Sequence, residues 1–340
     1  MSQLNVYQPH WVREDFIDFI GEKLDPMWAF KKVKAKLIAK QNLSNDFVQI
    51  ELRPNHNFHF KTYKAGQSIA LRMRIEGVYH QRNYSIVQVL ENGDLILAIK
   101  QQGKMSTALT NLSLGRIVEI SQPQGDFVLK QVVNPIVLLA SGSGITAIYA
   151  LLKQALQLQT AKIDLVYFTR DDAYHAEFKS LSLTYPQFNY HHINTLEQRQ
   201  HLDVDLLENL VPHFKMSDTY ACGAAGMMQA LHTLYSNLGI LDRLSSEYFQ
   251  LQVNENAEAQ PIRFIRTHQQ FEATTNLLSS AEQAGLNPQH GCRMGICNTC
   301  SCTKVSGSVK NLLTGEIDHA QNSQIKLCIS QALSPVEINL

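Results

Sequence analysis

The spacing of apolar residues changes from a helical period to short alternations within the first 40 residues. Residues 11–24 repeat apolar side chains at helical spacing, and Asp25-Pro26 ends the pattern. One face of this predicted helix carries Val12, Phe16, Phe19, Ile20 and Leu24. We expect that face to pack on the next domain; the alternative is a contact with a membrane or a partner. The polar face is mostly acidic, which argues against contact with anionic lipid.

From about residue 30 to residue 130, apolar and polar residues alternate in short runs that are typical of β-strands. Asn92-Gly93 lies between two of these runs and predicts a tight hairpin turn. Because many short strands follow one another at near-regular spacing, the pattern favours a small antiparallel barrel.

After residue 135, continuous apolar runs alternate with helical patterns, which predicts an α/β domain with a doubly wound parallel sheet. Residues 251–260 are largely polar and aperiodic, and strands return from residue 261. We therefore expect a multidomain chain, whose parts are an N-terminal helical extension over 1–29, an antiparallel β-barrel over 30–130, the α/β domain over 131–250, a linker over 251–260 and an α+β domain over 261–340.

Composition narrows the class of protein. The chain has 340 residues, of which 18% are charged, and thirty basic residues balance thirty acidic ones. This balance provides no overall field for nucleic acid. No apolar run reaches the roughly 18 residues of a membrane span, and the first residues lack the order of a signal peptide. We expect a cytosolic protein, in which crowded cysteines suggest metal binding or catalysis.

Four of the six cysteines lie within residues 290–302. The spacing Cys292-x4-Cys297-x2-Cys300, with Cys328 further on, is the plant-type ligand pattern of a [2Fe–2S] cluster. A zinc site usually needs two cysteine pairs, and a thioredoxin-type pair precedes a helix. Cys302 is expected to be a buried inert thiol, although its position leaves some ambiguity in the ligand set. Residues 261–340 resemble a plant-type ferredoxin domain, which implies a β-grasp fold.

A flavin site is expected because the cluster takes one electron, whereas nicotinamide gives two as hydride. Arg82-Asn83-Tyr84-Ser85 is the candidate: the arginine could meet a pyrophosphate, the tyrosine could pack on the flavin, and the serine could hydrogen-bond its ring. Alternation puts Arg82 and Tyr84 on one side of the strand and Asn83 and Ser85 on the other. Both pairs reach one flavin only if the strand wraps past it.

Two glycine-containing turns are candidate phosphate sites. In the first, Gly103 turns the chain, and Ser106 and Thr107 are expected to cap a helix whose start suits a phosphate. The second, GSGITA at 142–147, fits G-x-G-x-x-A between a strand and a helix, where Gly142 and Gly144 allow close approach of a pyrophosphate.

Arg170 and Asp171 follow the second parallel strand. Arg170 could meet the 2′-phosphate of NADPH, and Asp171 could repel that phosphate or bind the ribose hydroxyls of NADH. We lean towards NADPH. Arg170 could equally be a solvated loop residue.

The motifs R-x-Y-S, G-x-x-S, P-x-G-x-F and GSGIT occur in this order, and residues 30–250 thereby resemble the ferredoxin–NADP reductase superfamily. The resemblance implies FAD, with FMN less expected. The cofactor-binding set from motifs and resemblance is Arg82, Tyr84, Ser85, Lys100, Gly103, Ser106, Thr107, Gly142, Gly144, Thr146, Arg170 and Phe249.

The resemblance also implies a catalytic set of Ser85, Cys222 and Glu247. Cys222 begins a stretch similar to the family's C-G-P-x-x-M, with Ala224 in place of the proline, which puts the thiol near the nicotinamide. As a lone thiol that ends a buried strand, it could equally fill the core. Glu247 and Phe249 resemble the family's terminal acidic–aromatic pair beside the flavin.

The order of flavin, nicotinamide and cluster domains is similar to the reductase components of bacterial oxygenases and desaturases. With the N-terminal W-x4-F-I-x-F, the arrangement is most similar to reductases of membrane-bound di-iron fatty-acyl desaturases or alkane hydroxylases. A reductase of a soluble aromatic-ring or phenylacetyl-CoA oxygenase is a second reading. A redox-sensing module is a third.

Overall fold

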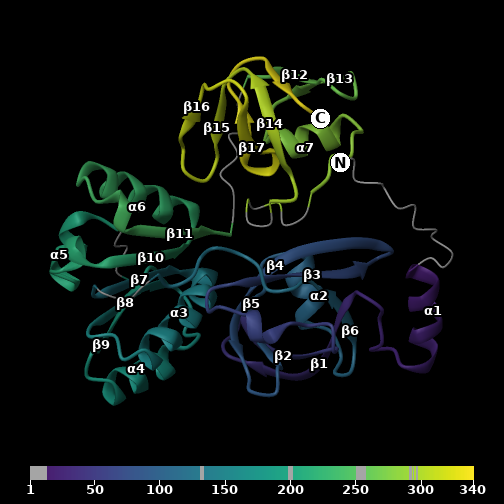
Figure 1. Ribbon diagram of the computed structural model, residues 1–340. Coiled ribbons are helices and arrows are strands. Elements are labelled where there is room, and N and C mark those ends of the chain that lie inside the picture. The colour runs from purple at the N-terminus through teal and green to yellow at the C-terminus, as the bar shows by residue number, and fades with distance from the viewer. Residues whose placement is uncertain are drawn as a thin grey trace, which may run out of the picture.

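The computed structural model describes residues 14–130, 134–197, 202–249, 258–290, 293, 295 and 298–340. Within these residues the chain forms a closed barrel, a five-stranded parallel sheet, and a third unit with one five-stranded and one three-stranded sheet (Figure 1). The predicted fold class, an antiparallel barrel followed by a parallel α/β sheet and an α+β domain, is confirmed.

The barrel closes through antiparallel pairs in the order β1-β2-β5-β4-β3-β6. Its strands are β1 (Val33–Asn42), β2 (Phe47–Pro54), β3 (Ser68–Ile75), β4 (Val78–Val89), β5 (Leu95–Lys100) and β6 (Ile117–Ile120). The predicted hairpin turn lies between β4 and β5, where Gly93 has φ +86° and the Leu90 N–H donates to the Asp94 carbonyl at 2.8 Å. One short helix, α2 (Lys104–Thr110), follows β5.

The parallel sheet has the order β11-β10-β7-β8-β9. Its strands are β7 (Ile136–Ser141), β8 (Ile163–Thr169), β9 (Phe188–Asn194), β10 (Asp218–Gly223) and β11 (Leu244–Tyr248), and its helices are α3 (Ile145–Gln157), α4 (His175–Thr184), α5 (Val204–Leu210) and α6 (Ala225–Asn237). The chain runs outward from β7 in both directions, so the strand order reverses between β7 and β10. A reversal of this kind opens a crevice at the carboxyl ends of the strands, where ligands bind in open α/β sheets.

Barrel and parallel sheet share one hydrophobic core. Phe47, Val87 and Ala98 of the barrel are buried in the same cluster as the apolar side chains of α3. At its edge, Lys153 Nζ of α3 donates to Gln88 Oε1 of β4 at 2.7 Å. Because separating the two units would expose this core, the crevice between them has a fixed geometry.

The third unit packs α7 (Leu277–Gln283) against a five-stranded sheet of order β13-β12-β19-β14-β17. The strands are β12 (Gln260–Phe264), β13 (Gln269–Ala273), β14 (Ser301–Ser306), β17 (Ser323–Lys326) and β19 (Val336–Ile338), and the smaller sheet has β15 (Val309–Asn311), β16 (Ile317–Asp318) and β18 (Ser330–Ala332). Lys304 is fully buried, and its ammonium donates to the carbonyls of Gly307, Asp318 and Ala320.

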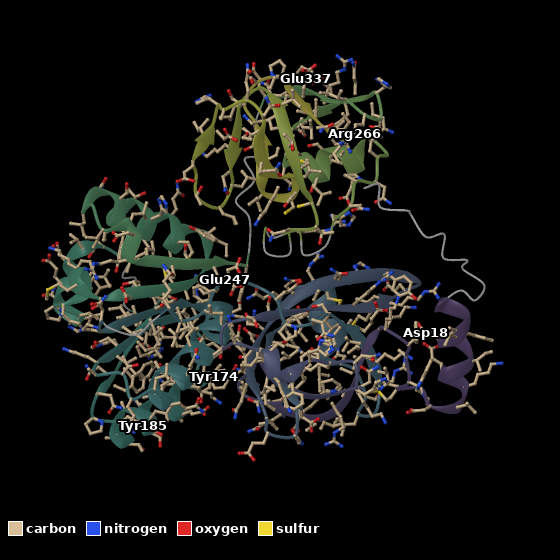
Figure 2. The ribbon with its side chains drawn as sticks, viewed as in Figure 1. Asp18, Tyr174, Tyr185, Glu247, Arg266 and Glu337 are labelled. Carbon is tan, nitrogen blue, oxygen red and sulfur yellow. The ribbon has the colours of Figure 1, made fainter. Side chains whose placement is uncertain are left out.

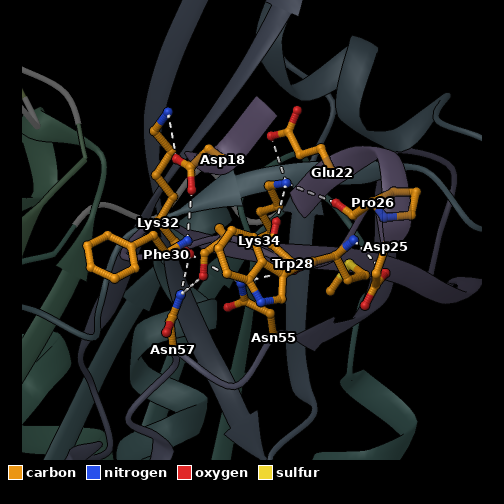
Figure 3. A network of polar contacts seen from close by, with 12 residues as sticks. Asp18, Glu22, Asp25, Pro26, Trp28, Phe30, Lys32, Lys34, Asn55 and Asn57 are labelled. Atoms are coloured by element: carbon orange, nitrogen blue, oxygen red, sulfur yellow. Dashed lines mark hydrogen bonds and ion pairs between the residues drawn. The ribbon is translucent and has the colours of Figure 1, made fainter. Parts of the chain in front are cut away.

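The first helix, α1 (Glu14–Leu24), reverses the predicted packing. Phe19, Ile20 and Leu24 are exposed, whereas Asp18 is buried against the barrel (Figure 2). The expectation that the apolar face packs on the next domain was therefore wrong, as far as the described side chains show; those of Val12 and Phe16 lie outside them. The physical reason is a polar network that stabilises the buried Asp18 carboxylate. Its Oδ1 accepts a hydrogen bond from the Phe30 N–H at 2.7 Å (Figure 3).

Candidate functional site

A cavity of about 450 Å³ opens between the barrel and the start of α3. It is lined by barrel, loop and helix residues, among them Arg82, Asn83, Tyr84, Ser85, Lys100, Gly103, Ser106, Ser143, Thr146 and Phe249. All four residues of the R-x-Y-S tetrapeptide reach it, although they alternate along β4. The cavity therefore borders β4 close to the place where α3 contacts this strand.

Unpartnered polar atoms line this cavity. Among the described residues, Ser85 Oγ and both amide atoms of Asn83 are buried without a hydrogen-bond partner. Leaving such groups unpaired costs about 1–3 kcal/mol each, and a ligand with donors and acceptors would remove that cost. The exposed Arg82 guanidinium lies beside them, while burial raises the pKa of Tyr84 to about 12 and keeps its hydroxyl neutral. A polar, anionic, ring-bearing ligand such as FAD fits this lining.

The start of α2 differs from the predicted cap. Gly103 is the N-cap residue, and Ser106 lies in the first turn. The Ser106 hydroxyl accepts the N–H groups of Gln102 and Gly103, both at 3.0 Å, and so fixes the turn at the cavity wall. Thr107 is exposed and is not among the residues that line the cavity. Ser106 therefore takes part in the cap, as the residue at position N3 whose hydroxyl accepts the N-cap N–H, whereas the N-cap itself is Gly103 and Thr107 has no part in this cap.

A second cavity, of about 440 Å³, lies at the carboxyl ends of the parallel strands. Its lining includes Lys100, Ser141, Gly142, Thr169, Arg170, Thr195, Ala224 and Met227. Gly142 has φ +51°, a conformation that favours glycine. Gly144 serves packing, because a Cβ there would lie 2.0 Å from the carbonyl oxygen of Cys222. The two glycines thus let the turn approach both a ligand and β10.

Ala224 replaces the expected proline for a visible reason. Its backbone N–H donates to Ser141 Oγ at 2.7 Å, which joins the start of α6 to the end of β7. Proline has no N–H and could not make this bond. The departure from the family pattern therefore keeps the cavity wall closed by a hydrogen bond.

Arg170 and Asp171 differ in their surroundings. Arg170 is exposed on the wall of the second cavity. The Asp171 carboxylate instead accepts a hydrogen bond from the backbone N–H of Ala173 at 2.8 Å. The backbone N–H of Asp171 donates to Thr169 Oγ1 at 2.9 Å. The carboxylate is therefore used within its own turn.

Cys222 and Glu247 are neighbours on the parallel strands β10 and β11, and Glu247 lies where the sheet approaches the barrel (Figure 2). Both are buried, and neither belongs to the lining of the two described cavities. Burial raises the pKa of Glu247 to about 8, and its Oε2 has no partner among the described residues. Burial, and next the charge of Glu247, raise the pKa of the Cys222 thiol. The pair lies behind the cavity walls.

Two predicted cluster ligands lie in the described region, while Cys292 and Cys297 lie outside it. Cys300 and Cys328 are buried with their sulfurs 3.2 Å apart, and the Gly295 N–H donates to Cys328 Sγ at 3.3 Å. Two thiolates on one tetrahedral metal lie about 3.8 Å apart, given metal–sulfur bonds of about 2.3 Å. The donor set therefore fits an iron site, although the two sulfurs lie closer together than one metal would hold them. Cys302 is also buried. Burial, and next the charge of the neighbouring Cys300, raises the pKa of the Cys302 thiol to about 12.

Sequence reasoning missed the side chains that hold the cluster loop, residues 290–302, in place. Lys326 Nζ of β17 donates to the Gly295 carbonyl. Arg293, at φ +60°, forms two 2.7 Å hydrogen bonds to the Glu282 carboxylate of α7. These contacts join residues 11 and 31 positions apart, and no local pattern indicates them.

Comparison with known proteins agrees with this geometry. Residues 34–129 match the oxidoreductase FAD-binding domain, residues 138–233 the oxidoreductase NAD-binding domain, and residues 264–333 the 2Fe-2S iron-sulfur cluster binding domain. An NADPH oxidoreductase of Mycobacterium tuberculosis is 28% identical over 324 residues, which cover 91% of this chain and 84% of the relative. A component of the 1,2-phenylacetyl-CoA epoxidase of Escherichia coli is 25% identical over 73% of this chain and 79% of its own.

A solved structure has the same architecture. Phthalate dioxygenase reductase, described as a modular structure for electron transfer from pyridine nucleotides to [2Fe-2S], aligns with a TM-score of 0.64 and 22% identity over 90% of this chain and 97% of its own. At this identity the likeness concerns the fold. The order of the three domains is the one that the family matches give for this chain.

Proposed function

Because this chain is an oxidoreductase that joins an FAD-binding, an NAD-binding and a [2Fe–2S] domain in that order, we propose that it takes electrons from NADPH and delivers them singly to a partner protein. FAD, when bound, accepts an electron pair as hydride and the cluster accepts single electrons. We propose domain limits of 30–130, 131–250 and 261–340, with a helical extension over 1–29.

The observation that carries the proposal is the meeting of the two cavities. Lys100 lines both of them, and in the GSGITA turn Gly142 lines one while Ser143 and Thr146 line the other. A flavin in the first cavity and a nicotinamide in the second would lie next to each other at this turn. Positioning of two reactants in this way is the main contribution that such a site makes to the rate.

On the flavin side, Arg82 supplies a fixed positive charge for the pyrophosphate. Tyr84 packs on the barrel core and offers a neutral aromatic face, and Ser85 Oγ offers an unused donor and acceptor to the ring. Gly103 and Ser106 shape the wall next to the phosphates. Phe249, which packs on the shared core, covers the other side of the cavity and excludes water.

On the nicotinamide side, we propose that NADPH is preferred to NADH. Arg170 is available to a 2′-phosphate, whereas one oxygen of the Asp171 carboxylate is engaged by the Ala173 N–H. Behind the cavity, Glu247 holds a proton on its carboxyl group at neutral pH. It thereby keeps a negative charge away from the site at which hydride moves.

The acceptor is the finer part of the proposal. We infer a membrane-bound di-iron fatty-acyl desaturase or alkane hydroxylase, on the resemblance of the N-terminal extension and the arrangement of domains. A soluble oxygenase is the second candidate, since relatives of this chain include a component of a phenylacetyl-CoA epoxidase and the ferredoxin reductase component of a 3-ketosteroid-9-alpha-monooxygenase.

The experiment uses the purified chain with NADPH or NADH and each candidate acceptor. We expect a lower KM for NADPH, and product formation with the desaturase or hydroxylase but not with the soluble oxygenase. Arg170→Ala should raise the KM for NADPH several-fold and leave that for NADH unchanged. Arg82→Ala should release FAD during gel filtration. Equal KM changes for both nucleotides would contradict the NADPH assignment, and full FAD retention would remove Arg82 from the flavin site.

A further inference from the structure

The turn between β8 and α4, residues 169–174, carries the cation assigned to the 2′-phosphate. Arg170 lies in this turn and is exposed on the wall of the second cavity. Its guanidinium forms no hydrogen bond or ion pair with any described residue. An arginine side chain has several rotatable bonds, so without such a partner the backbone of the turn decides which region the guanidinium reaches.

Local hydrogen bonds give the turn its shape. The Thr169 hydroxyl donates to the Asp171 carbonyl at 3.2 Å, and the Asp171 N–H donates to Thr169 Oγ1 at 2.9 Å. The Asp171 carboxylate accepts the Ala173 N–H at 2.8 Å. All three bonds lie within the turn, so they do not fix its position relative to the cavity.

Tyr174 attaches the turn to the rest of the protein. Its side chain is buried in the core that the barrel shares with the parallel sheet, where these two units meet (Figure 2). The centre of its ring lies 4.9 Å from that of Tyr149 of α3 and 5.9 Å from that of Phe178 of α4. Its hydroxyl donates to Gln49 Oε1 of β2 at 3.4 Å. One side chain thus joins the turn to α3 and to the barrel.

The backbone of Tyr174 shows that this attachment is under tension. Tyr174 is the N-cap residue of α4 and has φ +65° and ψ 0°, in the left-handed region that residues other than glycine rarely adopt. Such a conformation persists only where the surrounding structure holds it, and here the buried ring provides the hold. Without the ring, residue 174 would be free to leave this region, and the chain would enter α4 from another direction.

We propose that Tyr174 is a positioning residue for nucleotide selectivity: its buried ring holds the turn so that Arg170 stays at the cavity wall, within reach of a 2′-phosphate. Tyr174 is not among the residues that line the second cavity, so it acts through Arg170 and not by touching the nucleotide. This inference rests on the proposed preference for NADPH.

The test is the ratio of the dissociation constants of NAD⁺ and NADP⁺, measured by calorimetric titration of the purified holoprotein. We expect the wild type to bind NADP⁺ more tightly. Arg170→Ala should lower the ratio by about tenfold, the worth of one charge-assisted hydrogen bond. Tyr174→Phe keeps the ring and should keep the ratio.

Two further variants separate the ring from the backbone. Tyr174→Asn loses the ring but tolerates a positive φ, and it should lower the ratio several-fold. Tyr174→Val loses the ring and is β-branched, so it should lower the ratio to the level of Arg170→Ala. In the Arg170→Ala background, Tyr174→Asn should lower the ratio no further, because both changes remove the same interaction.

His268 provides a matched control. It is exposed between β12 and β13 in the third unit and has φ +53°, so His268→Val carries the same backbone penalty far from the turn. This variant should keep the wild-type ratio. A merely structural role of Tyr174 would lower the midpoint of thermal unfolding and leave the ratio unchanged.

The outcomes separate this inference from the proposed function. Equal dissociation constants in the wild type would overturn the preference for NADPH and this inference with it. A wild-type preference that folded, FAD-containing Tyr174→Asn and Tyr174→Val both retain would overturn the inference alone. If Tyr174→Val does not retain FAD, the ratio of Tyr174→Asn decides. A further several-fold loss in the double variant would refute the action through Arg170.

Discussion

Replacement of Glu247 by glutamine tests the buried acid behind the cavity walls. The side chain is 6% exposed, and burial raises its pKa from 4.5 to about 8 in the folded protein. The unfolded chain releases this proton near the ordinary value, so between the two values the folded state holds one more proton. Stability therefore falls as the pH rises through this window and levels off above it.

The size of the effect follows from the two pKa values. Each pH unit well inside this window costs about 1.4 kcal/mol, so ionisation of Glu247 removes on the order of 3–4 kcal/mol of folding free energy between pH 5 and pH 8. Glu247→Gln cannot ionise and should be more stable than the wild type by a margin that grows from pH 5 to pH 8. At roughly 2–4 °C per kcal/mol, the midpoint of thermal unfolding should rise by about 7–14 °C relative to the wild type across that range.

The assay is thermal unfolding of the holoprotein at several pH values, followed by circular dichroism and by flavin fluorescence. Glu272→Gln, at an exposed position of β13, is the control and should follow the wild type. Parallel curves for the wild type and Glu247→Gln from pH 5 to pH 8 would refute the reasoning.

Three further predictions concern the turn and the cluster. Gly144→Ala should lower the free energy of unfolding by about 1–3 kcal/mol and raise the KM for NADPH, because the added Cβ would meet the β10 backbone. The control is Gly226→Ala, which should not destabilise the protein, because a Cβ there meets no atom within 4 Å. Equal stabilities of the two variants would contradict this. Cys297→Ser should abolish cluster absorption and spare flavin reduction by NADPH, whereas Cys302→Ser should keep the cluster; loss of flavin reduction in folded Cys297→Ser would contradict the modular scheme. Lys326→Gln should lower the cluster's reduction potential by roughly tens of millivolts in a potentiometric titration, because it removes a cation from the cluster loop; an unchanged potential would contradict this.

Local patterns predicted what depends on neighbouring residues. The alternation after residue 30, the apolar runs after residue 135 and the spacing of the cysteines each reflect a constraint within a few positions, and the sheets and the domain order follow them. The G-x-G-x-x-A turn was likewise predictable, because Gly142 serves a turn that is local to β7 and α3, whereas the close approach of Gly144 to Cys222 of β10 is a long-range contact.

Prediction failed where distant residues decide the outcome. The orientation of α1 depends on Lys32 and Lys34 of the following segment, which pair with its acidic side chains. The buried positions of Cys222 and Glu247 depend on the pairing of β10 with β11, and periodicity does not show whether a strand end opens into a cavity.

Anaerobic titration of the purified protein with NADPH, followed by absorption and electron paramagnetic resonance, tests the central claim most directly. We predict that protein containing one FAD and two iron atoms takes up three electrons, two at the flavin and one at the cluster, and that the resonance of a reduced [2Fe–2S] cluster develops. Bleaching of the flavin without that resonance would contradict the account.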